Sequence, residues 1–450
     1  MSLRRRTVLG AGLAAAAATL AGCREVVRSA TAGPTSVPSP SAASPRPAAR
    51  RDTAPRAAAP ATTGTPVTFA DRRLLRELDR HLVPTSVNPE HPAYAGAIAL
   101  CQVNGTTTAR AWVGKALRYD AGPVLLPESK QVAMRHDSIF DLASITKVYT
   151  AILALQQVDK GRIDLDAPVV DYLPGFTGTG KNRVTVAMLL AHTSGLPVGA
   201  KVAGLPDDAA RRAAVLATPL VSDAIPGTVF RYSSVGLMVL AFLVEKVTGQ
   251  RLDRALTTGL TGPLGLKDTG FNPRTWLSAS DQASRLVATD ARSSRGLLRG
   301  VVHDDVANHM GGIAGHAGIF STAAEVAVIG QLLLNGGIHN GTRILSEEIT
   351  RQMLTNVNTG LPAVDPERPN RTSAHGLGVV LDQPWFMGRL SSPRTFGHTG
   401  FTGTSLVVHP DRRMVLVLLT NRAHPNWSWA NPDPIRVAVA NAVSATATPR

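Results

Sequence analysis

The sequence predicts an α/β (α+β) fold in which an antiparallel sheet is flanked by helices and carries an all-helical subdomain. Two candidate β-hairpins lie near opposite ends of the folded part, at residues 94–113 and 404–420. Between them, about residues 162–330 show mainly helical and loop patterns. Strands from both ends should therefore form one sheet, with the helical subdomain inserted between them. A cleft between these two parts is the expected place for a functional site.

The first part of the domain is expected to contain a helix, a hairpin and a second helix. Leucines at three- and four-residue spacing predict an amphipathic helix over residues 71–82. Residues 94–103 and 109–113 are predicted strands, and Asn104-Gly105 between them is typical of a tight hairpin turn. The next helix should begin at Ser144 and stop near residue 161, a glycine.

The rest of the domain is expected to change from helices to strands. The clearest helices of the middle region are predicted at residues 184–192, 235–248 and 323–335. Strands are then predicted at residues 375–381, 394–397, 404–409 and 414–420, and a closing helix at residues 435–443. No internal repeat is visible in this order of elements.

Residues 1–23 are predicted to be an export signal. Three consecutive arginines, Arg4 to Arg6, give a twin-arginine-like start, and a short Ala/Leu-rich stretch follows. The segment ends in Leu-Ala-Gly-Cys, which resembles the lipobox of bacterial lipoproteins, with Cys23 as the lipidated residue. We therefore expect a protein anchored by lipid to the outer face of the cytoplasmic membrane. An uncleaved anchor, or an ordinary cleaved signal with secretion, is the alternative.

Residues 24–66 are predicted to form a disordered tether because they are rich in Ala, Pro, Ser and Thr and cannot bury a core. The folded domain should then span residues 67–450. The formal net charge is +15. The signal carries +3 and the tether +4, so +8 remains in the domain. With 4% aromatic residues and no basic run in the domain, nucleic-acid binding is not expected.

Cysteine usage adds one expectation. The chain has two cysteines, and if Cys23 is acylated then Cys101 has no partner for a disulfide. Cys101 follows an apolar run and is expected to be an inert thiol in a buried strand.

The first candidate chemical motif is Ser144-Ile-Thr-Lys147. Residues three apart share one face of a helix, so the hydroxyl of Ser144 and the amine of Lys147 can touch. A serine hydroxyl needs an adjacent base to act as a nucleophile, and a desolvated lysine can provide one. An exposed serine beside a solvated lysine is the alternative interpretation, but the mouth of a buried helix favours a functional pair.

Two further motifs carry groups suited to acyl transfer. Tyr232-Ser-Ser234 brings a phenol to the start of a helix. Ser234 is a candidate substrate-binding residue, and a role as the helix N-cap is the structural alternative for it. His398-Thr399-Gly400 ends a predicted strand, and its small residues let a substrate backbone lie along the strand edge. A free N–H at Phe401, paired with that of Ser144, could bind a developing oxyanion.

The three motifs, in this order and spacing, resemble the active-site motifs of the penicillin-recognising serine hydrolases. The similarity is closest to the branch with class C β-lactamases, D-alanyl-D-alanine carboxypeptidases and related esterases, and it spans about residues 94–424. The resemblance implies a β-lactamase/DD-peptidase-like fold. It makes Ser144 the nucleophile, Lys147 its proton acceptor and Tyr232 a general base or acid. It makes residues 398–400 the substrate-binding strand and the Phe401 N–H the second oxyanion donor. No cofactor and no metal are implied.

Two positions depart from the family pattern. The second motif usually ends in Asn, whereas here it ends in Ser234, whose hydroxyl bridges fewer groups than an amide. The third motif often starts with Lys, whereas His398 is largely neutral at pH 7 and lacks a permanent charge for a substrate carboxylate. Both changes argue against efficient β-lactamase activity.

Other motifs in the chain support weaker hypotheses. The glycines before Lys181 imitate a nucleotide-binding loop but lack the Ser/Thr that follows. His303-Asp304-Asp305, with His309 and His316, could form a metal site, although their spacing is not standard and a loop lining the cleft is favoured. Ser194 is a rival nucleophile, but a turn serine explains it better.

The sequence therefore predicts an exported serine hydrolase that forms an acyl-enzyme at Ser144. Its substrates would be cell-wall peptides ending in D-Ala, or small esters or amides. A penicillin-binding-type sensor without turnover on the same scaffold is the alternative. The sequence does not specify the substrate or the oligomeric state.

Overall fold

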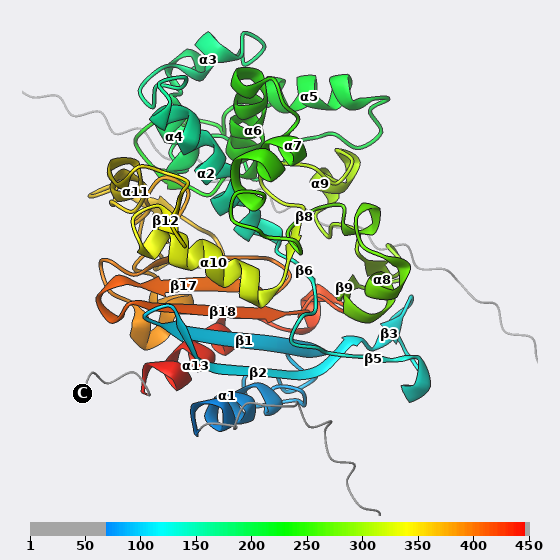
Figure 1. Ribbon diagram of the computed structural model, residues 1–450. Helices are drawn as coiled ribbons and strands as arrows, with labels where there is room; N and C mark the ends of the chain where they lie inside the picture. Colours follow the sequence, from blue (N-terminus) through cyan, green and yellow to red (C-terminus); the bar gives the residue numbers. More distant parts are fainter. Residues whose placement is uncertain (1–68, 446–450) are drawn as a thin grey trace, which may run out of the picture. The chain divides into compact units, whose positions relative to one another are not determined.

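A seven-stranded antiparallel sheet forms the base of the domain in the computed structural model, with strand order β15-β16-β17-β18-β1-β2-β5 (Figure 1). Its strands are β1 (Gly96–Val103), β2 (Thr106–Leu117), β5 (Val132–Ala133), β15 (Val380–Leu381), β16 (Phe396–Thr399), β17 (Ser405–His409) and β18 (Met414–Thr420). Because β1 pairs with β18 along its whole length, both ends of the domain meet at the centre of the sheet. This is the α/β (α+β) architecture predicted from the sequence.

The structure describes residues 69–445. The predicted signal at residues 1–23, Cys23 and the predicted tether at residues 24–66 all lie outside the described residues. Within residues 69–445, none of the helices has the length and apolar character needed to cross a bilayer.

Alternating side chains of β1 contribute to two separate cores. Ala97, Ala99 and Cys101 pack toward α1 (Phe69–Asp79) and α13 (Asp433–Ser444), whereas Ile98 and Leu100 belong to the core on the opposite face. Period-two alternation in a central strand buried on both faces explains this division. Cys101 is a free, buried thiol, and burial raises its pKa to about 11, as expected for an inert core cysteine.

Helix α10 (Ala323–Leu334) covers the face of the sheet opposite α1 and α13 (Figure 1). A Cβ on Gly330 would lie only 2.6 Å from a methyl group of Val415, so the helix approaches β18 closely because this residue is glycine. The predicted helical subdomain of about residues 162–330 therefore includes the first part of a helix that packs on the sheet. The helical periodicity alone does not indicate which partner a helix packs against.

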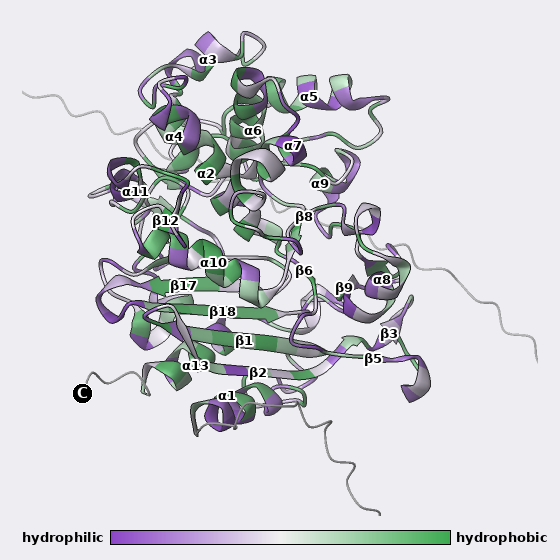
Figure 2. Cartoon of the chain, viewed as in Figure 1, coloured by the Kyte–Doolittle hydropathy of each residue, from purple (hydrophilic) through white to green (hydrophobic). Residues whose placement is uncertain are grey.

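The remaining helices lie beyond α10, except α12, which packs against α13 on the other face of the sheet. They are α2 (Thr146–Asp159), α3 (Val169–Tyr172), α4 (Val186–Leu190), α5 (Asp208–Ala217), α6 (Ser234–Thr248), α7 (Leu252–Leu256), α8 (Ala279–Arg285), α9 (Asp305–His309), α11 (Glu347–Met353) and α12 (Pro384–Met387). Helices α2 and α6 contact each other at the centre of this region, and hydrophobic residues run along α6 (Figure 2). A helix that is apolar on all sides must be buried on all sides.

Two predicted elements are shorter than expected. The predicted helix over residues 184–192 is α4, which ends at Leu190, and His192 has a left-handed φ of 58° that no helix can contain. The predicted strand over residues 375–381 is reduced to β15, since Gly378 has φ of 88° and breaks the extended run. Conversely, β2 is longer than the predicted strand over residues 109–113.

Asn421, directly after β18, links β1 and β2 at the centre of the sheet through side-chain hydrogen bonds. Its carboxamide accepts a hydrogen bond from the Gly96 N–H at 2.7 Å and donates one to the Lys115 carbonyl at 3.1 Å. We expect Asn421→Ala to lower the free energy of unfolding by about 1–3 kcal/mol, because two buried backbone groups lose their partner. Urea unfolding would measure this, with exposed Thr107→Ala of β2 as the control. Equal midpoints for the two variants would contradict the prediction.

Candidate active site

Ser144 and Lys147 meet at the start of α2. Ser144 lies in a single 3₁₀ turn, Ala143–Ile145, which leads directly into the helix. The Lys147 side-chain nitrogen donates a hydrogen bond to the Ser144 hydroxyl at 2.9 Å, as the three-residue spacing predicts. Lys147 is fully buried, whereas Ser144 is partly exposed. The pair therefore combines a desolvated amine with a hydroxyl that a ligand can reach.

Tyr232 completes a three-residue cluster with this pair. It follows β7 (Phe230–Arg231), and its phenol donates a hydrogen bond to the Ser144 hydroxyl at 2.8 Å. The Lys147 nitrogen lies 4.9 Å from the centre of the Tyr232 ring. His192 packs on the same ring with centroids 4.8 Å apart. Residues 88 positions apart in the chain thus place a hydroxyl, an amine and a phenol in mutual contact.

The structural alternative for Ser234, a role as the N-cap of its helix, is wrong. Ser233 caps α6, accepting a hydrogen bond from the Gly236 N–H at 2.9 Å and donating one to the Pro197 carbonyl at 2.9 Å. Ser233 has the extended φ and ψ that a cap requires, so the helix begins one residue earlier than expected. Ser234 is the buried first residue of α6, and its hydroxyl has no hydrogen-bond partner within residues 69–445.

The end of β16 lies against the segment that precedes Ser144. Two hydroxyls make the connection: Thr402 donates to the Asp141 carbonyl at 2.8 Å, and Thr404 donates to the Leu142 carbonyl at 3.0 Å. A side chain on Gly400 would collide with the Leu142 carbonyl, so glycine permits this close approach. The Phe401 N–H, next along the chain, has no hydrogen-bond acceptor among the residues that the structure describes. Thr399 and Gly400 thus end a strand beside the Ser144 turn.

His398 is a buried, neutral residue of this strand. Its Nδ1 faces the Thr399 carbonyl at 2.8 Å, and its Nε2 has no partner within the described part of the chain. Burial, together with the positive charge of Lys147, holds the pKa of His398 well below its usual range. The side chain that replaces the more common lysine therefore provides no fixed positive charge.

His316 and Asp304 form a second layer behind Lys147. The Lys147 side-chain nitrogen donates to the His316 carbonyl at 3.0 Å, and the His316 ring nitrogen Nε2 lies 2.9 Å from the Asp304 carboxylate. Burial alone would raise the pKa of Asp304, but its contacts with His316 and with the Ala307 N–H hold this pKa well below its usual range. Burial lowers the pKa of His316. Gly315 allows this arrangement, since a Cβ there would collide with the Leu237 carbonyl of α6.

For His316 and Asp304 the sequence favoured a loop lining the cleft over a metal site, but it did not predict their contact with Lys147. Within residues 69–445, no group of three or more His, Cys, Asp or Glu residues has the geometry to hold a metal ion. His309 lies exposed on α9 instead of joining the other two. The glycines around His316 were the available signal, because they indicate a loop packed tightly against another element.

Arg436 of α13 is a second residue that sequence analysis missed. Its guanidinium is buried and donates to the Gly400 carbonyl at 2.6 Å and to the Thr404 carbonyl at 3.0 Å. Asp433, on the same helix, is its ionic partner at 2.8 Å. Arg436 therefore holds both ends of the loop that carries the Phe401 N–H. No local pattern predicts this contact, because an arginine in a C-terminal helix is usually solvated.

The rival motifs have structural roles. Lys181 is buried over the Phe176 ring, 4.2 Å from its centre, and donates to the Thr177 and Leu216 carbonyls. Burial lowers its pKa to about 8. An amine enclosed in this way cannot reach a bound phosphate. Ser194 is also buried, and its hydroxyl accepts a hydrogen bond from the Leu196 N–H at 3.3 Å, as expected for a turn serine.

The buried histidines around Tyr232 predict how the free energy of unfolding depends on pH. Burial lowers the pKa of His375 to about 3, and those of His192 and His398 are also lowered well below their usual range, mainly by burial. The unfolded chain takes up these protons below about pH 6.5, whereas the native state does not. The free energy of unfolding should therefore fall as the pH decreases from about 6.5 to 4, by up to about 1.4 kcal/mol per pH unit for each histidine.

Urea unfolding between pH 4.5 and 7.5 tests this prediction. His375→Gln should reduce the slope of unfolding free energy against pH by about one proton, whether or not the variant is less stable at every pH. Exposed His309→Gln should keep the slope of the unmodified protein. A stability that does not change over this pH range would contradict the assignment of neutral buried histidines.

Comparisons with known proteins agree with the fold. The family model described as "Beta-lactamase" matches residues 72–441. A protein of Escherichia coli K12 named "Putative D-alanyl-D-alanine carboxypeptidase" is 34% identical over 348 residues, covering 70% of this chain and 75% of that protein. A penicillin-binding protein homolog from Caulobacter crescentus has the same fold, with a TM-score of 0.60, 19% identity and coverage of 85% of this chain and 99% of that one. EstCE1, "a hydrolase with promiscuous acyltransferase activity", has a TM-score of 0.60 at 20% identity, over 83% of this chain and 100% of that one. These matches confirm the predicted family, and the chain belongs to the beta-lactamase family of serine hydrolases.

Proposed function

We propose that this protein hydrolyses D-Ala-terminated cell-wall peptides, or small esters or amides, through an acyl-enzyme at Ser144. One observation supports the proposal above all others. The Ser144 hydroxyl is partly exposed and lies within 2.9 Å of the Lys147 amine and 2.8 Å of the Tyr232 phenol. Nucleophilic catalysis by serine requires this combination of an accessible hydroxyl and adjacent groups that can exchange its proton.

Acylation begins with attack of the Ser144 oxygen on the substrate carbonyl. The Ser144 proton passes to Lys147, acting as an unprotonated amine, as the new bond forms, while Tyr232 keeps its phenol proton for the leaving group. The carbonyl oxygen becomes an oxyanion, for which the N–H groups of Phe401 and Ser144 are the proposed donors. The leaving group then takes a proton from Tyr232 as its bond to the carbonyl carbon breaks.

Deacylation uses the same groups in reverse. Tyr232, now deprotonated, accepts a proton from a water molecule that attacks the acyl carbonyl. The ester bond to Ser144 breaks, and Ser144 recovers its proton through Lys147 or Tyr232. Neither step requires a charge at His398, which fits its neutral, buried state. Thr399 and Gly400 would bind the substrate backbone along the end of β16.

The choice of substrates is supported by the relatives and by the altered motifs. The Escherichia coli relative bears the name of a carboxypeptidase, and EstCE1 is described as a hydrolase with acyltransferase activity. A neutral His398 and the short side chain of Ser234 favour peptide, ester or amide bonds over rapid β-lactam hydrolysis. Specificity within this fold depends on the pocket.

Steady-state hydrolysis of three substrates tests the proposal. Acyl-D-Ala-D-Ala, a p-nitrophenyl ester and nitrocefin represent the three reaction types, and intact-protein mass spectrometry would detect the acyl group on Ser144. We expect a burst followed by steady hydrolysis of the peptide or the ester. Stable acylation of Ser144 without turnover would instead identify a non-hydrolytic penicillin-binding-type sensor. Absence of both acylation and hydrolysis would refute the proposed function.

We further propose that the protein is exported and anchored by lipid at Cys23. The arginines at its start and the lipobox-like ending of residues 1–23 support this. In cells that express the full chain, labelled palmitate should be incorporated into the protein, and Cys23→Ser should prevent this. Unchanged incorporation in Cys23→Ser would contradict lipid attachment at that residue.

A further inference from the structure

Two exposed aromatic side chains stand together beside the Ser144 turn. Phe401 is 45% exposed and Trp427 is 40% exposed, and their ring centres lie 5.7 Å apart. The other Phe, Tyr and Trp side chains whose burial the structure describes are buried or partly buried. Leaving two large aromatic rings in water loses the free energy that their burial would provide. A paired exposed surface of this kind marks a place where another group binds.

Several contacts hold the two rings in place. The Arg422 guanidinium lies 4.6 Å from the centre of the Phe401 ring and donates a hydrogen bond to the Trp427 carbonyl at 2.6 Å. Arg422 is itself largely buried, so it supports the pair from beneath. The His303 ring packs on the Phe401 ring with centres 5.3 Å apart. The backbone N–H of His303 donates to the Asp141 carboxylate at 2.7 Å. The surface is therefore preformed, which reduces the entropy lost when a ligand binds.

The position of this surface relative to the nucleophile follows from the chain. Phe401 comes directly after Gly400. A Cβ built on Gly400 would lie 3.3 Å from the Ala143 Cβ, so the two backbones are close. Ala143 is the neighbour of Ser144. The Phe401 N–H is a proposed oxyanion donor. A substrate carbonyl bound to this N–H therefore lies beside the residue that carries the Phe401 ring. A substituent one or two bonds from that carbonyl can therefore reach the aromatic pair.

We infer that Phe401 and Trp427 form an aromatic subsite that binds an aryl or similarly bulky apolar group adjacent to the scissile carbonyl. This inference rests on the proposed function and specifies its substrate class as esters or amides with such a group on one side of the reacting bond. Offset or edge-to-face contacts with the two rings would select an aryl group over a short alkyl group.

Three esters that differ on one side at a time test the subsite. Ethyl acetate is the reference, ethyl phenylacetate adds an aryl group to the acyl side, and benzyl acetate adds one to the leaving side. Release of acid gives kcat/KM for each. We expect one of the two aromatic esters to be preferred by about tenfold over ethyl acetate. Trp427→Ala should remove most of this ratio, and Phe401→Leu should reduce it.

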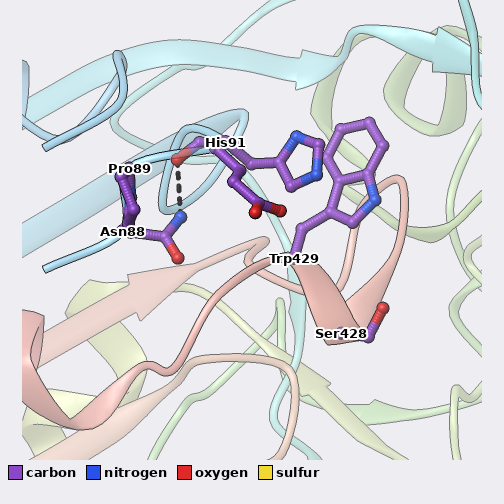
Figure 3. A pocket seen from close by; sticks show the side chains of 6 residues that line it. Asn88, Pro89, His91, Ser428 and Trp429 are labelled. Carbon is purple, nitrogen blue, oxygen red and sulfur yellow. Dashed lines mark hydrogen bonds between the residues drawn. The ribbon is translucent and has the colours of Figure 1, made fainter.

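Trp429→Ala is the matched control. Trp429 is only two residues from Trp427, but it stacks on His91 with ring centres 4.0 Å apart and lines a different pocket with Asn88, Pro89 and Ser428 (Figure 3). The ratio should not change in this variant. If Ser144 becomes acylated but the ratio is close to one, or if Trp427→Ala and Trp429→Ala behave alike, the aromatic subsite is wrong. If Ser144 reacts with no ester and no fluorophosphonate, the proposed function fails and the subsite fails with it.

Discussion

Ser144→Ala is expected to abolish covalent labelling by a fluorophosphonate or a fluorescent penicillin, and to lower kcat/KM for any hydrolysed substrate by about 10⁴-fold or more. The reason is that the Ser144 oxygen is the atom that both Lys147 and Tyr232 contact. Neither of these groups can replace it as a nucleophile in the same position. The variant should fold normally, since Ser144 is partly exposed and alanine leaves little empty space.

Gel fluorescence and intact-protein mass spectrometry would measure the labelling. Ser280→Ala, an exposed serine of α8, is the control and should label like the unmodified protein. Equal labelling of Ser144→Ala and Ser280→Ala would mean that the reactive group lies elsewhere. The assignment of Ser144 as the nucleophile would then be wrong.

Lys147→Met is expected to have the second largest effect, a decrease in kcat/KM of about 10²- to 10⁴-fold. Methionine has nearly the same length, so it keeps the packing of a fully buried side chain while it removes the amine. Lys147→Arg is the more informative variant. Arginine keeps the positive charge but cannot lose its proton in a protein. If Lys147 acts as a base, both variants should therefore be similarly slow.

Lys181→Met is a matched control, because Lys181 is the other lysine that is fully buried in the described part of the chain. Its amine bonds to the Thr177 and Leu216 carbonyls and makes no contact with Ser144. Lys181→Met should change the urea midpoint but leave kcat/KM within about twofold, as surface and core changes away from a site usually do. Near-normal activity of Lys147→Arg would show that Lys147 provides charge and not a base.

The sequence predicted the fold class because its signals are local. Apolar runs on both sides of Pro410-Asp411-Arg412 identified β17 and β18 within one residue, and Asn104-Gly105 located the β1–β2 turn. Gly249 marked the end of α6, where its φ is 67°. The predicted bounds of an element were wrong where contacts with residues distant in the chain set a backbone angle. His192 is one case, since its left-handed φ shortens α4 although the residue type does not require it.

The contacts of the candidate site also fall into those that local sequence predicts and those that it does not. The contact between Ser144 and Lys147 follows from the geometry of one helical turn, so the sequence alone determined it. The approach of Tyr232 was expected only from the resemblance to a family. The choice of Ser233 over Ser234 as the cap was missed, because two adjacent serines have the same capping preference and the Pro197 carbonyl decides between them.

What the sequence by itself determined was the family, the order of strands and helices, and the nucleophile–amine pair on one turn of α2. Only the tertiary structure decided that the His316 carbonyl meets Lys147, that Arg436 holds the Gly400 loop, and that Phe401 and Trp427 form one surface. The physical reason is that these contacts join residues far apart in the chain. Local propensity and spacing have no information about such pairs, whereas the packing of α2, α10 and α13 around one sheet fixes them.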